Sequence, residues 1–163
     1  MLALASCKEI IDTEKSATTS TEDFVSSSYD LIIVCKEKWT KSLNPGNYFF
    51  LGTNVESSKL VKYKQKTGLE YCWGMNVKHS LARYVDFSSA TIYNSWECSL
   101  VSSETVAYGN LNSIIWETKE YGTRCIYTSF SLENTNITYS PSFPIFISNI
   151  KEWSIDGYNK ILL

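Results

Sequence analysis

The sequence has few of the residues from which active sites and metal sites are usually built. Among its 163 residues there is one histidine, His79, and there is no Gly-x-Ser-x-Gly motif and no glycine-rich phosphate loop. The five cysteines lack the C-x-x-C spacing that closes a zinc site. A catalytic triad would have to combine His79 with Ser80 and Asp86, and closeness in sequence does not establish geometry. We therefore predict no enzymatic activity, no metal and no cofactor.

An excess of one charge and long apolar runs are also missing. Fifteen Lys and Arg stand against 17 Asp and Glu, a net charge of −2, whereas nucleic-acid binding usually needs a basic field. No stretch reaches the about 18 consecutive apolar residues of a transmembrane helix. Glu97 with Glu104, and Glu117 with Glu120, lack any feature that would raise the pKa of one partner, as glycosidases require. Neither nucleic-acid binding nor glycoside hydrolysis is expected.

The N-terminus carries a short motif that changes how the rest of the chain is interpreted. Leu4-Ala5-Ser6-Cys7 resembles the lipobox of bacterial lipoprotein precursors, in which the signal is cut just before the cysteine. The resemblance implies that residues 1–6 are the remnant of a signal peptide and that Cys7 is the lipidation site. Lys8 in place of Asp resembles the pattern that is sorted to the outer membrane. We therefore expect a cell-envelope lipoprotein facing the periplasm or the surface.

The next stretch is polar. Residues 13–28 contain nine Ser or Thr and only two sizeable apolar side chains, Phe24 and Val25. Such a segment cannot bury enough apolar surface to offset the entropy of ordering it. We therefore expect residues 7–28 to be a flexible tether, followed by a single β-rich domain over residues 29–163.

The pattern past residue 29 has period two and is rich in β-branched and aromatic residues. Turn signals recur about every ten residues, which predicts an all-β fold, an antiparallel sandwich or barrel of about 8–10 strands. Strands are expected up to the C-terminus, including residues 143–150 and 153–163. One interval differs, because Val77, Leu81 and Val85 lie on one face of a helix. We predict one short helix near residues 76–85.

An exported chain with an even number of cysteines after the anchor is expected to form disulfides. The four candidates are Cys35, Cys72, Cys98 and Cys125. Four cysteines allow three pairings, of which Cys35–Cys72 and Cys98–Cys125 are favoured, because each pair joins neighbouring parts of a meander.

Two sets of residues are candidates for binding. Lys62, Lys64 and Lys66 alternate with other residues, so they are expected to project from one face of a strand. They form either a solvated edge or a positive stripe for an acidic protein, an anionic glycan or lipid headgroups. The second set consists of tyrosines beside turn signals, which either bind a partner or fill the boundary between loops and core: Tyr108, Tyr121, Tyr139 and Tyr158.

These features predict a lipid-anchored lipoprotein whose β-domain binds a protein partner in the envelope, in the manner of inhibitor or immunity lipoproteins. Its contact with the membrane is expected through the lipid anchor. Two alternatives stay open. One is a lipocalin-like carrier of a small ligand. The other is a eukaryotic secreted β-protein, for which Asn136-Ile137-Thr138 is a glycosylation sequon.

Overall fold

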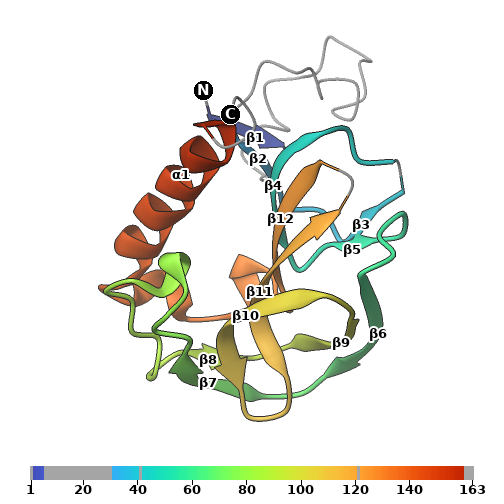
Figure 1. The fold of residues 1–163 in the computed structure, drawn as a ribbon. Coiled ribbons are helices and arrows are strands. Elements are labelled where there is room, and N and C mark those ends of the chain that lie inside the picture. The colour runs from blue at the N-terminus through green and yellow to red at the C-terminus, as the bar shows by residue number, and fades with distance from the viewer. Residues whose placement is uncertain (1, 6–30, 41, 121, 160–163) are drawn as a thin grey trace, which may run out of the picture.

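The computed structural model describes residues 2–5, 31–40, 42–120 and 122–159 (Figure 1). The predicted lipidation site Cys7, the predicted tether over residues 7–28 and Tyr121 lie outside the described residues. Within the described ranges no helix is long and apolar enough to cross a membrane.

The central element is a mixed sheet, to which the described residues contribute eight strands. In sheet order these are β1 (Leu2–Ala5), β2 (Leu31–Val34), β4 (Gly46–Leu51), β12 (Thr123–Thr128), β11 (Ser113–Glu120), β10 (Ser103–Gly109), β7 (Glu70–Met75) and β8 (Thr91–Ile92). The first four strands run parallel to one another, and the pairs from β12 to β8 are antiparallel. Two small sheets pair β3 (Lys38–Trp39) with β5 (Asn54–Val55) and β6 (Val61–Thr67) with β9 (Ser95–Leu100).

Helices occupy a smaller part of the chain. Among the described residues, the short 3₁₀ helices are η2 (Ser80–Ala82), η3 (Leu132–Asn134) and η4 (Ile137–Tyr139), and the long helix is α1 (Phe143–Asn159). The predicted all-β class with a short helix near residues 76–85 is confirmed, with η2 as that helix. Two features differ from the expectation. Half of the large sheet is parallel rather than antiparallel, and the C-terminal segment is helical where strands were expected.

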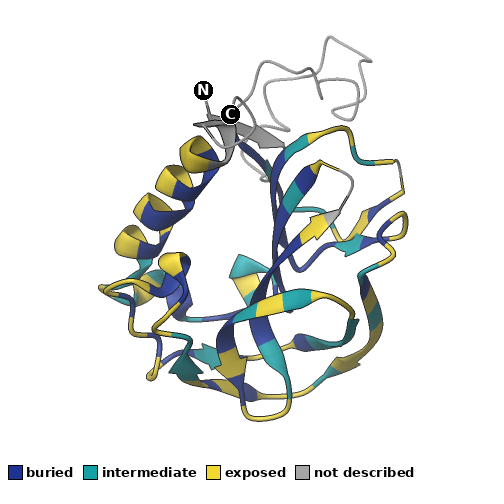
Figure 2. Cartoon of the chain, in the orientation of Figure 1, coloured by how far each residue is buried: buried dark blue, intermediate teal, exposed yellow. Residues whose placement is uncertain are grey.

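The C-terminal helix forms because its buried residues repeat at helical spacing. Phe146, Ile150 and Trp153 are all buried and lie at i, i+4 and i+7. One side of α1 is therefore buried and the opposite side is exposed (Figure 2). The strand predicted over residues 143–150 was wrong because these residues form a short apolar run, which periodicity alone cannot assign to a strand or a helix.

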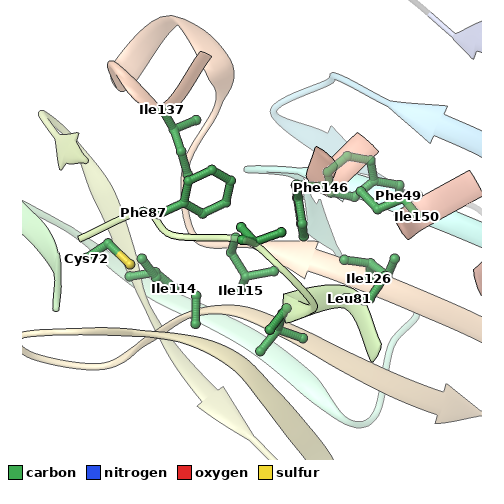
Figure 3. Packing of buried hydrophobic residues seen from close by; sticks show 14 of the residues in the cluster. Phe49, Cys72, Leu81, Phe87, Ile114, Ile115, Ile126, Ile137, Phe146 and Ile150 are labelled. Atoms are coloured by element: carbon green, nitrogen blue, oxygen red, sulfur yellow. The ribbon is translucent and has the colours of Figure 1, made fainter. Parts of the chain in front are cut away.

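The core consists of two clusters, one on each face of the sheet. Alternate residues of β4 supply both, because successive side chains of a strand point to opposite faces. Phe49 belongs to the larger cluster, which lies between the sheet and α1 and includes Phe146 (Figure 3). Tyr48 and Phe50 belong to the smaller cluster, where the ring of Phe50 stacks on Tyr127 at 5.0 Å. The sheet is thus buried on both faces.

The expected disulfides are corrected by the structure, because the four described cysteines form none with one another. Cys35 follows β2 and Cys72 lies on β7, and five strand-to-strand steps of about 4.8 Å separate these strands in sheet order. A disulfide joins Cα atoms about 5.5–6 Å apart. Cys98 and Cys125 lie on different sheets, and the Cys98 thiol donates to the carbonyl of Trp96 at 3.4 Å. Burial raises the pKa of Cys72 to about 11 and that of Cys98 to about 12, so both stay protonated at neutral pH.

The packing of α1 predicts a large loss of stability for Phe146→Ala. The ring contacts Phe87 edge-on at 5.5 Å and Phe49 at 6.3 Å, so its removal leaves a cavity under the helix. Urea unfolding should show a loss of about 3–5 kcal/mol. Ile155→Ala, on the exposed side of the same helix, should change stability by about 0.5 kcal/mol or less. Equal losses in the two variants would contradict the helical packing.

Candidate functional site

Three rings on the uncovered face of β7 and β10 form what we call the aromatic surface: Tyr71, Trp73 and Tyr108. Because β7 alternates, Tyr71 and Trp73 point outward while Cys72 points into the core. Trp73 is 69 % exposed, and its ring lies 6.2 Å from that of Tyr108. Leu111, which is also exposed, follows β10 in the turn to β11. The aromatic surface is therefore continuous across two paired strands.

The segments that carry this surface contain few charged residues. Residues 67–77, 87–96 and 105–116 include a single charged residue, Glu70, which is buried, and the exposed charge on β10 is Glu104, near the start of that strand. The cores of protein interfaces are likewise depleted in charged residues and enriched in Tyr and Trp. The residues around Trp73 therefore have the composition of an interface core.

The buried carboxylate of Glu70 holds the aromatic surface in place from behind. It accepts a hydrogen bond from the Ser95 hydroxyl at 2.6 Å and from the backbone N–H groups of Leu111 and Asn112 at 3.2 and 3.3 Å. The close approach requires Gly109, because an added Cβ there would lie 2.1 Å from a Glu70 oxygen. Glu70 thus joins β7, β9 and the β10–β11 turn into one rigid unit.

His79 belongs to a second buried polar group, beneath α1. Its Nε2 lies 3.2 Å from Glu117, and the other carboxylate oxygen of Glu117 lies 3.7 Å from the Arg124 guanidinium. Arg124 stacks 4.1 Å over the Trp153 ring and donates to the Trp153 carbonyl at 2.8 Å. Burial alone would raise the pKa of Glu117, but the hydrogen bond with His79 and the charge of Arg124 hold that pKa below its ordinary value.

Both ring nitrogens of His79 have structural partners. The Nδ1 atom accepts a hydrogen bond from the Leu81 N–H at 3.2 Å, which caps η2, and Nε2 faces Glu117. The His79 side chain is buried. Asp86, a possible triad partner, accepts instead from the Ser88 N–H at 2.8 Å, which lowers its pKa. The geometry therefore gives His79 a structural role. Among the described residues, no group of three or more His, Cys, Asp or Glu is placed to hold a metal ion.

The predicted lysine stripe is broken by a register shift at Lys64. Lys62 lies opposite Ser99, whereas Lys66 lies opposite Trp96, and these two residues of β9 are on opposite faces of the strand. Lys62 and Lys66 therefore project to different faces, which corrects the prediction that all three lysines share one face. Each lysine has a nearby acceptor: the Glu56 carbonyl at 3.0 Å for Lys62, Glu97 at 3.5 Å for Lys64 and Glu37 at 3.2 Å for Lys66.

The structure does not gather the predicted tyrosines. Tyr108 lies in the aromatic surface, while Tyr139 is 88 % exposed on η4, the helix that precedes α1. The side chain of Tyr158, like Tyr121, lies outside the described part of the chain. The period-two pattern puts Tyr71 and Trp73 on one face of a strand, but it does not say which face is exposed. For that reason both were missed as binding candidates.

The geometry of Glu117 predicts a pH-dependent contribution to stability. Its pKa is lower in the folded state than in the unfolded chain, so its contribution is fully present above the unfolded value of about 4.3 and is lost as pH falls through the folded pKa. Glu117→Gln should lower the free energy of unfolding by about 1–3 kcal/mol at pH 7, and the difference from wild type should shrink toward pH 3. Glu104→Gln, at an exposed site 3.9 Å from His79, is the control and should have little effect. A difference independent of pH would contradict the assignment.

Comparisons with known proteins place the chain by fold alone. No family model matches the sequence, and no curated protein matches it. Its fold is similar to part of a β-galactosidase from Rahnella sp. R3, with a TM-score of 0.54 and 8 % identity, covering 76 % of this chain and 23 % of that one. It is also similar to part of a β-galactosidase from Bacillus circulans sp. alkalophilus, with a TM-score of 0.51 and 7 % identity, covering 76 % and 22 %. The chain thus spans less than a quarter of either structure, and the similarity concerns architecture only.

Proposed function

We propose that this chain is a binding protein that captures a protein partner through the aromatic surface, without catalysis. The observation that carries the proposal is the exposure of Trp73 beside Tyr71 and Tyr108, on segments that contain few charged residues. Tryptophan and tyrosine dominate the few residues that supply most of the binding energy in protein interfaces. Because the Trp73 ring is so exposed, most of its surface area is available to be buried by a partner.

The rigidity of the surface supports the same function. Tyr71 is fixed through its backbone N–H, which donates to the Asn110 side chain at 2.9 Å. The adjoining turn is fixed by Glu70 from behind. A preorganised surface loses little conformational entropy on binding, so more of the contact energy remains as affinity.

The chemistry of the surface indicates the kind of partner. The three rings offer apolar area, and the amides of Asn110 and Asn112 at the turn offer donors and acceptors for a neighbouring backbone. The three rings and the two amides carry no charge, so contact with them is not selective for an anionic or a cationic ligand. An apolar patch on another protein fits it better than the acidic partner that a lysine stripe would select.

We further propose that the protein is held at a cell-envelope membrane through lipidated Cys7. Leu4-Ala5-Ser6-Cys7 supports this, together with the polar segment over residues 7–28, which would separate the domain from the bilayer. A flexible linker of that length has a root-mean-square extension of about 25 Å.

Trp73→Ala is expected to abolish most of the partner binding. An envelope protein retained by the wild-type domain should be identified by mass spectrometry and purified, and its affinity measured by calorimetry. Loss of a central tryptophan should weaken it by about 2 kcal/mol or more, roughly thirtyfold. Stability should be nearly unchanged, because the ring is exposed.

Tyr139→Ala is the matched control, since it removes a ring outside the aromatic surface that is even more exposed than Trp73. It should bind like wild type. Partner binding that survives Trp73→Ala but is lost with Tyr139→Ala, or with Lys62→Glu and Lys64→Glu together, would locate the interface elsewhere.

Lipidation of Cys7 is tested by fractionation. Expressed with a complete signal, the wild-type protein should partition into detergent, whereas Cys7→Ser should be released as soluble or uncleaved protein. Cys98→Ser leaves the motif intact and should behave like wild type.

Cleavage before Cys7 also removes β1, which pairs with β2 along Leu2–Ala5. If the protein is processed at this position, its domain must fold without β1. A chain that begins at Cys7 should then still unfold in one cooperative transition. Failure of this shortened chain to fold, or identical fractionation of wild type and Cys7→Ser, would rule out processing at this position.

A further inference from the structure

The strands β2, β4 and β12 are parallel neighbours in the central sheet (Figure 1). A cleft of about 740 Å³ opens at their carboxyl ends. The residues that end or follow these strands line it, namely 35–37, 51–52 and 130–134. The remaining side comes from Lys66 and residues 94–96 on the β6–β9 ribbon. In sheets of parallel strands, ligands commonly bind at the carboxyl ends of the strands. The volume of this cleft lies within the range of about 300–1,000 Å³ that is usual for ligand sites.

The floor of the cleft depends on a glycine. Gly52 has a φ of +63°, in the left-handed region, and an added Cβ would lie 2.6 Å from the backbone nitrogen of Ser131. Its N–H donates to the Thr128 hydroxyl at 3.1 Å. Glycine thus lets the end of β4 lie directly against the segment that follows β12. The floor is therefore rigid backbone.

One wall carries an ion pair beside an aromatic ring. The Lys66 ammonium lies 3.2 Å from the Glu37 carboxylate and 5.1 Å from the centre of the Trp96 ring. Lys66 reaches this position only because the register shift at Lys64 turns it away from the face that Lys62 occupies. Register shifts and bulges commonly re-aim side chains next to functional sites.

The lining also carries amides and a hydroxyl. The Asn134 side chain donates to the Ser131 hydroxyl at 2.8 Å, and the Asn94 amide donates to the Asn134 oxygen at 3.3 Å. The charged residues of the lining balance, with Lys36 and Lys66 against Glu37 and Glu133. The cleft thus presents donors and acceptors side by side with no net charge.

We propose that this cleft binds a neutral, polyhydroxylated ligand, a monosaccharide or the end of an oligosaccharide. Each hydroxyl group of such a ligand both donates and accepts a hydrogen bond, and the lining supplies amide and ammonium donors beside carboxylate and amide acceptors. The half-buried Trp96 ring offers an apolar surface to the C–H face of a sugar ring.

Other ligand classes fit the lining less well. A phosphorylated or strongly anionic ligand would need positive charge in excess, and here the lysines are balanced by glutamates. A fatty ligand would cover several polar groups without partners, at about 1–3 kcal/mol for each. The ligand class follows from the lining and is independent of the aromatic surface on β7 and β10.

Titrations of the whole chain with glucose, galactose, mannose and N-acetylglucosamine test the proposal. Binding is followed by tryptophan fluorescence and by ligand-observed NMR. At least one sugar should bind saturably at millimolar concentrations. Lys66→Ala and Asn94→Ala, both at exposed positions, should each weaken that binding about tenfold or more, because each removes a hydrogen-bonding group from the cleft.

Lys62→Ala is the matched control, since it removes a lysine from the other face of the same strand, and Trp73→Ala tests independence from the aromatic surface. Both should bind sugar like wild type, so failure of one proposal is distinguishable from failure of the other. The inference is overturned if none of the four sugars binds. It is also overturned if Lys66→Ala has no effect, or if inorganic phosphate or glycine binds the cleft more tightly than every sugar.

Discussion

Burial of the central sheet on both faces is the constraint on which the rest of the structure depends. β4 shows it most clearly, because Phe49 packs under α1 while Tyr48 and Phe50 pack in the cluster on the opposite face. Each face therefore needs a cover, and the chain supplies α1 for one and the β6–β9 ribbon for the other. The ribbon covers the middle of its face but leaves the outward side of β7 and β10 bare. The aromatic surface lies on that bare part, and the cleft lies where the ribbon meets the carboxyl ends of β2, β4 and β12.

Two buried carboxylates, Glu70 and Glu117, hold the turn beside the aromatic surface and the helix α1 in place. An unpaired buried charge costs several kcal/mol, so a buried glutamate must be matched by donors. Glu70 is matched by two backbone N–H groups and a hydroxyl, and it orders the turn beside the aromatic surface. Glu117 is matched by His79 and Arg124. Arg124 contacts α1 through Trp153, and His79 caps η2, whose Leu81 carbonyl accepts a hydrogen bond from Asn149 of α1. The one histidine of the chain thus helps to hold a helix onto the sheet.

Much of the fold follows from the sequence, and the differences have identifiable causes. The alternation in β4 and β7 predicted strands, and it placed Tyr71 and Trp73 on one face. It does not tell which face another element covers, because that depends on contacts distant in sequence. The strand expected over residues 143–150 was wrong because an apolar run of that length fits a strand as well as a helix. The prediction of a lysine stripe was wrong because of a single register shift. The alternation of residues in the sequence does not reveal such a shift. The cleft was not predicted, because its walls come from five separate segments of the chain.

The two proposed sites share one buried hydrogen-bonded group. Ser95 lines the cleft, and its hydroxyl donates to Glu70, which orders the turn of the aromatic surface. The same hydroxyl lies 2.6 Å from that of Thr67, so its hydrogen bonds are already made within the protein. Turning it toward a ligand would leave the buried carboxylate one donor short, at a cost of about 1–3 kcal/mol. Ser95 therefore acts as fixed wall rather than as a ligand contact, and recognition in the cleft falls to the exposed side chains around it, Asn94 and Lys66 foremost.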